Sequence, residues 1–201
     1  GLDDAGQARF LPVMVGALVT VSLLQVLANF ANDYGDFRKG TDTAAGRTDR
    51  TLASGALTPG AMRRAMVLTG TLALVGGLTT LGLAFVPGWV PGTESSSLQG
   101  ASMAALFALG IAGIAAAVRY TVGSSAYGYV GLGDLFVLVF FGFVGVCGVA
   151  LLLTHQTSFP WLLPALFSGC MGVAVLNLNN LRDHESDATA GKRTMVVRLG
   201  F

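Results

Sequence analysis

Charged residues are scarce in this sequence. Asp, Glu, Lys and Arg make up 11% of its 201 residues, hydrophobic residues make up 53%, and the mean hydropathy is +0.66. A water-soluble domain carries about 25% charged residues to cover its surface. Because so few charges cannot cover a surface that faces water on all sides, we expect lipid to cover much of the molecule.

Cysteine and net charge are low as well. The sequence has two cysteines, both inside apolar runs, which excludes a secreted disulfide scaffold. A net charge of +1 argues against a nucleic-acid-binding protein, so no nucleic acid is expected as a partner. No cleavable signal peptide is recognisable, and the chain begins at Gly1 rather than at a methionine. We expect residues 1–201 to form a single membrane domain that is part of a longer protein.

Long gaps between charged residues locate the membrane spans. A helix needs roughly 20 apolar residues to cross about 30 Å of hydrocarbon. The uncharged segments do not alternate apolar and polar residues, so helices are favoured over strands. We therefore predict an all-α, polytopic transmembrane bundle with five helices, at about 10–32, 61–86, 98–118, 132–153 and 160–182.

Basic residues predict which side of the membrane each loop faces. Five spans place residues 33–60, 119–131 and 183–201 on one side, and every Lys and Arg except Arg9 lies on or near that side. Short loops rich in Lys and Arg remain in the cytoplasm. We therefore predict a multi-pass protein of the inner (plasma) membrane whose acidic segments, 33–60 and 183–201, face the cytoplasm.

Two polar segments on this side repeat one spacing. The first, NFANDYGDFRKGTD, contains four polar residues related by steps of three or four, which share a helical face if the helix continues: Asn29, Asn32, Asp33 and Asp36. The second, NLNNLRDHESD, repeats the pattern with Asn177, Asn180, Asp183 and Asp187. The similarity suggests two related halves of one site and a weak internal repeat.

The alternative to a shared site is that the two polar segments are separate loops in water whose charges merely end the helices. The asparagines argue against it, because they extend into the apolar runs, where an unpaired amide is costly and polar residues are functional candidates. Gathered carboxylates repel one another and invite a counter-ion. Oxygen ligands suit Mg²⁺, which commonly binds one or two carboxylates together with substrate phosphates. Interleaved Arg and Lys residues suit those phosphates, so the pattern indicates diphosphate chemistry on a lipid.

These residues resemble the UbiA superfamily of intramembrane prenyltransferases, which pairs an N-D-x-x-D-x-x-x-D motif with a D-x-x-x-D motif. Asn32, Asp33 and Asp36 match the first three places of the first motif. The fourth place holds Gly40, and the nearest acid is Asp42. The acid of the fourth place is therefore displaced by two residues, to Asp42.

The second motif and its neighbours extend the resemblance. Asp183 and Asp187 match D-x-x-x-D, the following GKRT is also similar to the family, and Arg50 begins a segment that resembles R-P-L-x-S-G. The branch most similar to the sequence is that of 1,4-dihydroxy-2-naphthoate polyprenyltransferases of menaquinone synthesis. Two departures are a middle loop with Ser124 and Ser125 where many members carry a basic pair, and five spans where the family typically has nine.

The resemblance implies a Mg²⁺-dependent transfer of a polyprenyl group from its diphosphate to an aromatic acid within the lipid bilayer. It implies metal ligation by Asp33, Asp36, Asp183 and Asp187. Catalytic roles fall to Asn32, Asp36 and Asp187. Contacts to the diphosphate fall to Arg50, Asn180 and Lys192. In the naphthoate branch, the acceptor loses its carboxylate as CO₂.

Two other functions stay open. One is a sister prenyltransferase that acts on 4-hydroxybenzoate or another acceptor. The other is a transporter or a cation-binding membrane module whose acids line a pathway. A conduction path places ionisable groups deep inside several spans, whereas the predicted spans carry them only at their ends. The distribution therefore favours an enzyme.

Overall fold

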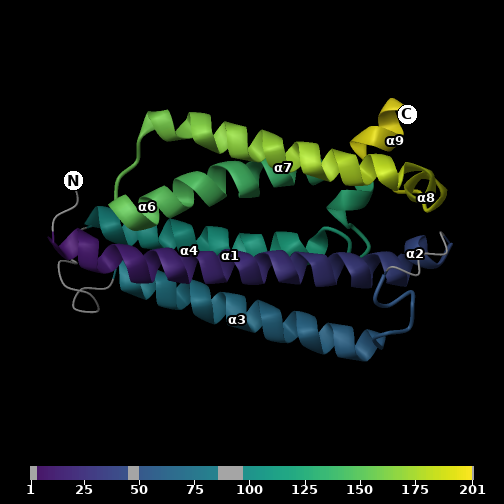
Figure 1. Ribbon diagram of the computed structural model, residues 1–201, viewed down its shortest axis with the longest axis horizontal. Helices are drawn as coiled ribbons and strands as arrows, with labels where there is room; N and C mark the ends of the chain where they lie inside the picture. The colour runs from purple at the N-terminus through teal and green to yellow at the C-terminus, as the bar shows by residue number, and fades with distance from the viewer. Residues whose placement is uncertain (1–3, 45–49, 86–96, 201) are drawn as a thin grey trace.

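A computed structural model describes residues 4–44, 50–85 and 97–200 (Figure 1). Every regular element in these residues is helical. Five helical segments are long and apolar enough to cross a membrane: Ala8–Lys39, Pro59–Phe85, Gln99–Arg119, Gly133–Thr154 and Phe159–Arg182. The predicted all-α bundle with five spans is therefore confirmed.

The described helices follow one another along the chain in a simple order. The first half of the chain contains α1 (Asp4–Lys39), α2 (Thr41–Ala44), α3 (Pro59–Phe85) and α4 (Ser97–Arg119). The fourth span joins α5 (Gly133–Val137), a π-helix η2 (Leu138–Cys147) and α6 (Gly148–Thr154), and is preceded by the 3₁₀ turn η1 (Tyr127–Val130). The last part contains η3 (Phe159–Trp161), α7 (Leu162–Arg182), α8 (His184–Thr189) and α9 (Met195–Leu199).

Helix α1 is longer than the predicted span at 10–32. It continues without a break to Lys39, and the next residue, Gly40, adopts a φ of 79°, which ends the helix at low steric cost. The first acidic motif therefore lies on a helix, and the condition for its polar residues to share a face is met. The first seven residues of segment 33–60 are the last two turns of α1.

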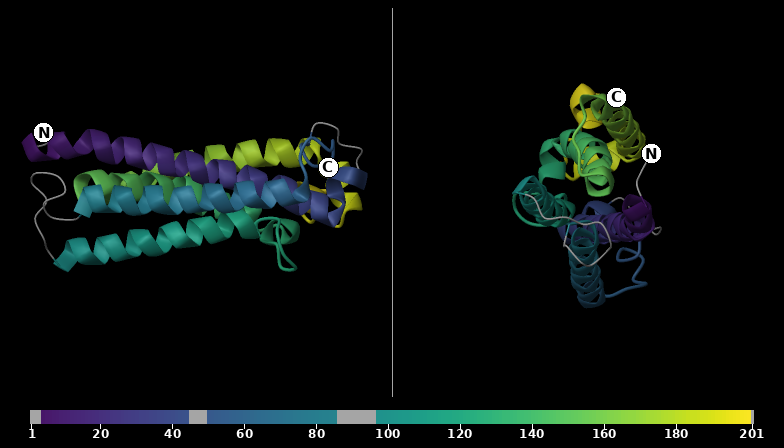
Figure 2. Two further views of the ribbon diagram at one scale, coloured as in Figure 1. Left: turned by 90° about the horizontal axis from the view of Figure 1, so that it is seen from below. Right: turned by 90° about the vertical axis from the view of Figure 1, so that its left-hand side faces the viewer.

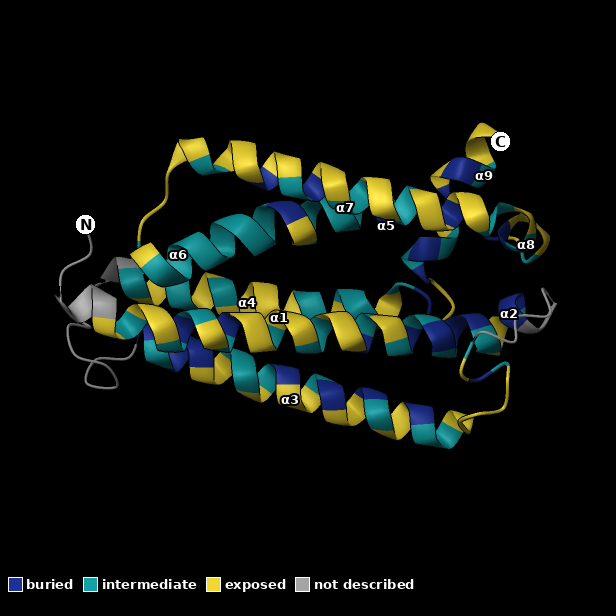
Figure 3. Ribbon diagram, viewed as in Figure 1, coloured by how far each residue is buried: buried dark blue, intermediate teal, exposed yellow. Residues whose placement is uncertain are grey.

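Helix α1 packs along α3 and α4, and α7 packs along η2 (Figures 1 and 2). Glycines allow the second contact: a Cβ on Gly142 would lie 2.6 Å from the carbonyl oxygen of Ala165, and one on Gly169 would lie 2.7 Å from Leu138 Cδ1. Small residues let membrane helices approach closely. The outward faces of the helices are largely exposed and apolar, as expected for surfaces in contact with lipid (Figure 3).

One end of the bundle gathers the polar elements. The C-terminal ends of α1 and α7, together with α2, α8 and the segment before α5, lie at this end (Figure 1). The described parts of segments 33–60, 119–131 and 183–201 therefore share one end, as the count of five spans requires. We call it the site end, and the opposite end, which contains His155, the far end.

Candidate active site

A buried ion cluster joins the two acidic motifs at the site end. Asp36 on α1 and Asp187 on α8 are each 3% exposed, and Lys192 is 6% exposed. The Lys192 ammonium lies 3.7 Å from Asp36 Oδ2 and 3.4 Å from Asp187 Oδ1. Residues about 150 positions apart in the sequence therefore meet through a single positive charge.

The backbone after α7 explains how Lys192 reaches this position. Helix α7 ends at Arg182, Asp183 follows it, and α8 carries the buried Asp187. Gly191 then adopts a φ of 74°, which turns the chain back so that the Lys192 amide donates to the Asp187 carbonyl at 2.8 Å. Thr194 caps α9 by accepting a hydrogen bond from the Val197 amide. Gly191, Lys192 and Thr194 of the GKRT segment thus each have a structural role.

Tyr129 of η1, in the loop between the third and fourth spans, contacts this cluster. Its hydroxyl donates to Asp36 Oδ1 at 2.7 Å and lies 2.7 Å from Thr41 Oγ1, and its carbonyl accepts from the Arg193 amide at 2.9 Å. The Lys39 ammonium lies 3.4 Å from the centre of its ring. Burial, followed by the negative charge of Asp36, raises the pKa of Tyr129 above its usual range, so the phenol stays protonated and can donate.

The other predicted polar residues take separate positions around the cluster. Arg50 Nε lies 3.9 Å from Asp42 Oδ1, which brings the displaced acid of the first motif to the site. Asp183 accepts two hydrogen bonds from Arg182, at 2.8 and 2.9 Å. Asn177 donates to Asp134 at the start of the fourth span, so this asparagine of the second stripe pairs with a neighbouring helix.

A cavity of about 630 Å³ begins at this cluster and continues between the spans. Its polar mouth is lined by seven of the eight predicted site residues: Asn32, Asp36, Arg50, Asn180, Asp183, Asp187 and Lys192. Its deeper part is lined by apolar side chains from α1, α4 and the fourth span, Leu24, Phe136, Phe140, Val144 and Leu152 among them. Asp33 is buried but is not part of this lining. The cavity thus has a charged mouth and a long apolar interior.

Aromatic side chains lie where the polar mouth meets the apolar interior. Tyr127 stacks on Phe136 with ring centres 3.9 Å apart, and the Tyr127 hydroxyl donates to the Ala116 carbonyl at 2.9 Å. Tyr120 meets Tyr127 edge-on at 5.4 Å. Burial raises the pKa of both tyrosines, and both line the cavity. Tyr120 and Tyr127 therefore belong to the site region.

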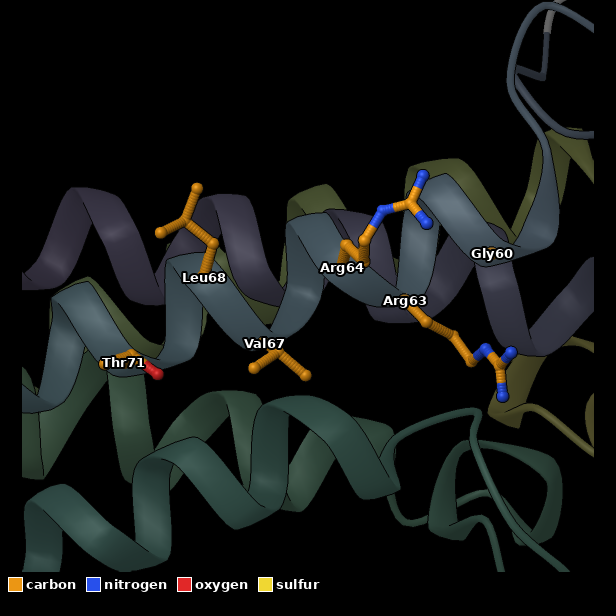
Figure 4. A pocket seen from close by; sticks show the side chains of 6 residues that line it. All are labelled: Gly60, Arg63, Arg64, Val67, Leu68 and Thr71. Carbon is orange, nitrogen blue, oxygen red and sulfur yellow. The ribbon is translucent and has the colours of Figure 1, made fainter.

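A second hollow, of about 620 Å³, lies on the surface of α3 (Figure 4). All of its lining residues belong to that helix: Gly60, Arg63, Arg64, Val67, Leu68 and Thr71. The side chains of Arg63 and Arg64 point in different directions (Figure 4). This hollow contains no carboxylate and contributes nothing to the ion cluster.

The UbiA prenyltransferase family profile matches residues 96–201, which is more than half of the chain. The chain belongs to this family. It is 46% identical over 189 residues to 1,4-dihydroxy-2-naphthoate octaprenyltransferase of Haemophilus influenzae, a match that covers 94% of this chain and 58% of that protein. The enzyme of the same name from Escherichia coli is 42% identical over 200 residues, with 96% and 60% covered.

More distant members are also similar. Human UbiA prenyltransferase domain-containing protein 1 is 32% identical over 189 residues, which is 94% of this chain and 51% of the human protein. No solved structure matches the chain. The chain therefore spans about three fifths of the two bacterial relatives and about half of the human one.

Membership of the UbiA family implies a metal, and the site offers suitable ligands. Among the described residues, the buried acceptor atoms Asn32 Oδ1, Asp33 Oδ1 and Asp187 Oδ2 find no hydrogen-bond partner, and such atoms call for a donor or a cation. All three are oxygens, which suit a hard divalent cation. Within the described residues, no three His, Cys, Asp or Glu side chains form a metal cluster. A bound cation would therefore need ligands from the substrate as well, as is common for Mg²⁺.

Proposed function

We propose that this chain is the catalytic part of a prenyltransferase that moves a polyprenyl group from its diphosphate to 1,4-dihydroxy-2-naphthoate, with loss of CO₂, in menaquinone biosynthesis. The observation that carries this proposal is the cavity whose mouth holds Asp36, Asp187 and Lys192 and whose interior is apolar and aromatic. A polyprenyl diphosphate has the same division into a charged head and a long hydrocarbon chain. The relatives at 46% and 42% identity carry the name of a naphthoate octaprenyltransferase.

The charged mouth suits the diphosphate. Lys192 and Arg50 line it as cations, and the amides of Asn32 and Asn180 are available to orient phosphate oxygens. Mg²⁺, held by Asp36 and Asp187 with support from Asp33 and Asp183, would neutralise the diphosphate as it leaves. The role of the basic side chains is to stabilise the same negative charge from the protein side.

The apolar interior suits the prenyl chain and the reacting centre. Phe136, Phe140 and Val144 exclude water from the allylic carbon, which water would otherwise trap after the C–O bond breaks. The stacked pair of Tyr127 and Phe136 offers a flat aromatic surface beside this point for the acceptor ring. A ring carbon next to a hydroxyl then forms the new C–C bond, and the carboxylate leaves that carbon as CO₂.

Product analysis tests the proposal. The full-length protein in membranes, given a polyprenyl diphosphate and carboxyl-labelled 1,4-dihydroxy-2-naphthoate, should release labelled CO₂ and form an unlabelled prenylated naphthoquinol by mass spectrometry. Label retained in the lipid product would exclude the naphthoate reaction. Prenylation of 4-hydroxybenzoate in its place would leave the family assignment intact and establish the sister activity.

We also propose that the site end faces the cytoplasm. The basic residues concentrate at this end, and such loops remain in the cytoplasm. Single cysteines introduced at Ser54 and Ser186 should react with an impermeant thiol reagent only when the cytoplasmic side is exposed. A cysteine at Gln156, at the far end, should react from the other side. Labelling of Ser54 and Gln156 from the same side would refute this orientation.

A further inference from the structure

The ammonium of Lys192 stands where the two acidic motifs would hold a cation. Asp36 Oδ2 and Asp187 Oδ1 both face it, at 3.7 and 3.4 Å, and the side chains of all three residues are at most 7% exposed. The other oxygen of Asp36 already accepts the Tyr129 hydroxyl at 2.7 Å. Both oxygens of Asp36 are therefore engaged by groups of the protein itself.

A second cation at these carboxylates meets electrostatic opposition. A divalent ion bound to Asp36 and Asp187 would lie within a few ångströms of the Lys192 charge, and water screens like charges weakly at a buried position. The backbone limits how far Lys192 can withdraw, because its amide is bonded to the Asp187 carbonyl at 2.8 Å. Only its side chain can turn away.

We propose that Lys192 is a built-in counter-ion that holds the two acidic motifs together and competes with a divalent cation for Asp36 and Asp187 until a diphosphate draws its ammonium away. The proposal extends the function proposed above and rests on it for the identity of the anion. Competition by Lys192 makes the binding of the metal and the binding of the diphosphate cooperative. Each favours the other because the anion removes the charge that opposes the cation, and this coupling is reciprocal.

Binding of Mn²⁺ alone, followed by electron paramagnetic resonance on the purified full-length protein in nanodiscs, tests the competition. Lys192→Met should bind Mn²⁺ about tenfold or more tightly than the wild type, because a nearby positive charge is lost. The wild type should bind Mn²⁺ much more tightly when inorganic pyrophosphate is present, and Lys192→Met should lose most of this gain. Unchanged or weaker Mn²⁺ binding by Lys192→Met would overturn the proposal.

Arg193→Met is the matched control. It removes one positive charge from the next residue, whose side chain is exposed and whose amide contact with the Tyr129 carbonyl survives the substitution. Its Mn²⁺ affinity should stay within about twofold of the wild type, since charges exposed to water are screened. An increase in Mn²⁺ affinity as large as that of Lys192→Met would mean that the net charge of the protein is responsible. That result would contradict a specific competition between the Lys192 ammonium and the metal.

Stability without metal gives a second readout. In chelator, Lys192→Met should melt about 5 °C or more below the wild type, because it leaves two buried carboxylates without their partner. Mn²⁺ should recover most of this loss, and Lys192→Arg should lose less because it keeps the charge. A melting temperature equal to that of the wild type in chelator would show that Lys192 does not hold the motifs together.

The wild-type protein alone provides a test if Lys192→Met does not fold. Reaction of Lys192 with an amine-selective acylating reagent, read by mass spectrometry, should be slow in chelator and faster in Mn²⁺, because the metal takes its carboxylate partners. Equal or slower reaction in Mn²⁺ would refute the displacement. These binding results do not depend on turnover, so a failure of the product analysis with displacement intact would reject only the proposed reaction.

Discussion

The two ends of the helical bundle use polar residues in different ways. At the site end, Asp36, Asp187 and Lys192 are almost completely buried and contact one another across distant segments. At the far end, His155 stacks on Phe85 with ring centres 4.7 Å apart, and its Nδ1 lies 3.2 Å from Gln99 Nε2. The site end concentrates charge, whereas the described part of the far end joins helix ends through a ring contact and single hydrogen bonds.

This difference indicates that the polar residues of the site end serve ligand binding, whereas those of the far end serve stability. Buried carboxylates and an ammonium cost desolvation free energy, so their gathering is weak evidence for a stabilising role and stronger evidence for ligand binding. The far-end contacts join spans that are distant in sequence; Arg9, for example, donates to the Leu153 carbonyl at 3.4 Å. Loss of the Asp36 or Asp187 charge should therefore change activity more than stability, whereas loss of Lys192, which joins the two motifs, should change both. Substitutions away from the site end should mainly change stability.

The largest effect is expected from removing either carboxylate of the ion cluster. Asp36→Asn and Asp187→Asn keep the size of the side chain but remove the charge, and each should lower kcat/KM by about 100-fold or more. Steady-state kinetics on the full-length protein, with its amount in the membrane measured by immunoblot, checks this. Activity within threefold of the wild type in both variants would show that the reaction does not need these carboxylates and that the site end is not the active site.

The next effect is expected from Tyr129→Phe, which keeps the ring over which Lys39 lies but removes the hydrogen bond to Asp36. Loss of a hydrogen bond to a charged group is worth about 1.5–3 kcal/mol, so kcat/KM should fall about tenfold or more. The fall should appear mainly in kcat if Tyr129 orients Asp36 for the reaction.

A serine of the same loop provides the control for Tyr129. Ser125 is exposed, and its hydroxyl accepts from Arg119 at 3.3 Å outside the cavity lining. Ser125→Ala should leave kcat/KM within about twofold, since exposed substitutions have small effects. Equal losses in both variants would indicate a general effect of the loop rather than the contact with Asp36.

The fold is largely predictable from the sequence because its signals are local. Charge-free segments of sufficient length define spans wherever they occur, and all five predicted spans lie within several residues of the observed bounds. The π-helix Leu138–Cys147 is not predictable in this way, because a change from four- to five-residue hydrogen bonding leaves no mark on an apolar sequence. The predicted end of α1 is too early because the charges of Asp33 and Asp36 resemble the start of a loop.

The site is predictable only in part, because its contacts join distant segments. The spacing of the polar residues and the family motifs indicate Asp36, Asp187 and Lys192. Tyr129 is not identifiable from the sequence as a partner of Asp36, since the two residues are 93 positions apart and no local pattern links them. Asp33 falls outside the cavity lining although it is adjacent to Asn32, because consecutive residues on a helix point about 100° apart.

A contact away from the site end should control stability. Gly142→Ala would place a Cβ 2.6 Å from the backbone oxygen of Ala165, so η2 and α7 must separate. We expect a loss of about 1–3 kcal/mol of stability, with kcat per folded molecule little changed. Gly110→Ala is the matched control, because in the described part of the chain no atom outside its own stretch of helix lies within 4 Å of its Cβ position. Thermal denaturation in detergent compares the two, and equal melting temperatures would contradict the packing role of Gly142.

The smallest effect is expected at the far end, from the protonation of His155. Burial, followed by the positive charge of Arg9, lowers the pKa of His155 below 6.5, although a hydrogen bond with the backbone of Ala84 partly offsets the shift. The unfolded chain then binds more protons than the folded one, so this contribution to stability is complete above about pH 6.5 and declines as the pH falls toward the folded pKa.

His155→Phe keeps an aromatic ring against Phe85 and removes the titration. The melting temperature of the wild type should therefore fall more between pH 7.5 and pH 5.5 than that of His155→Phe, by about 1–3 °C, while kcat at pH 7.5 is the same in both. A steeper fall in the variant would show that protonated His155 stabilises the far end.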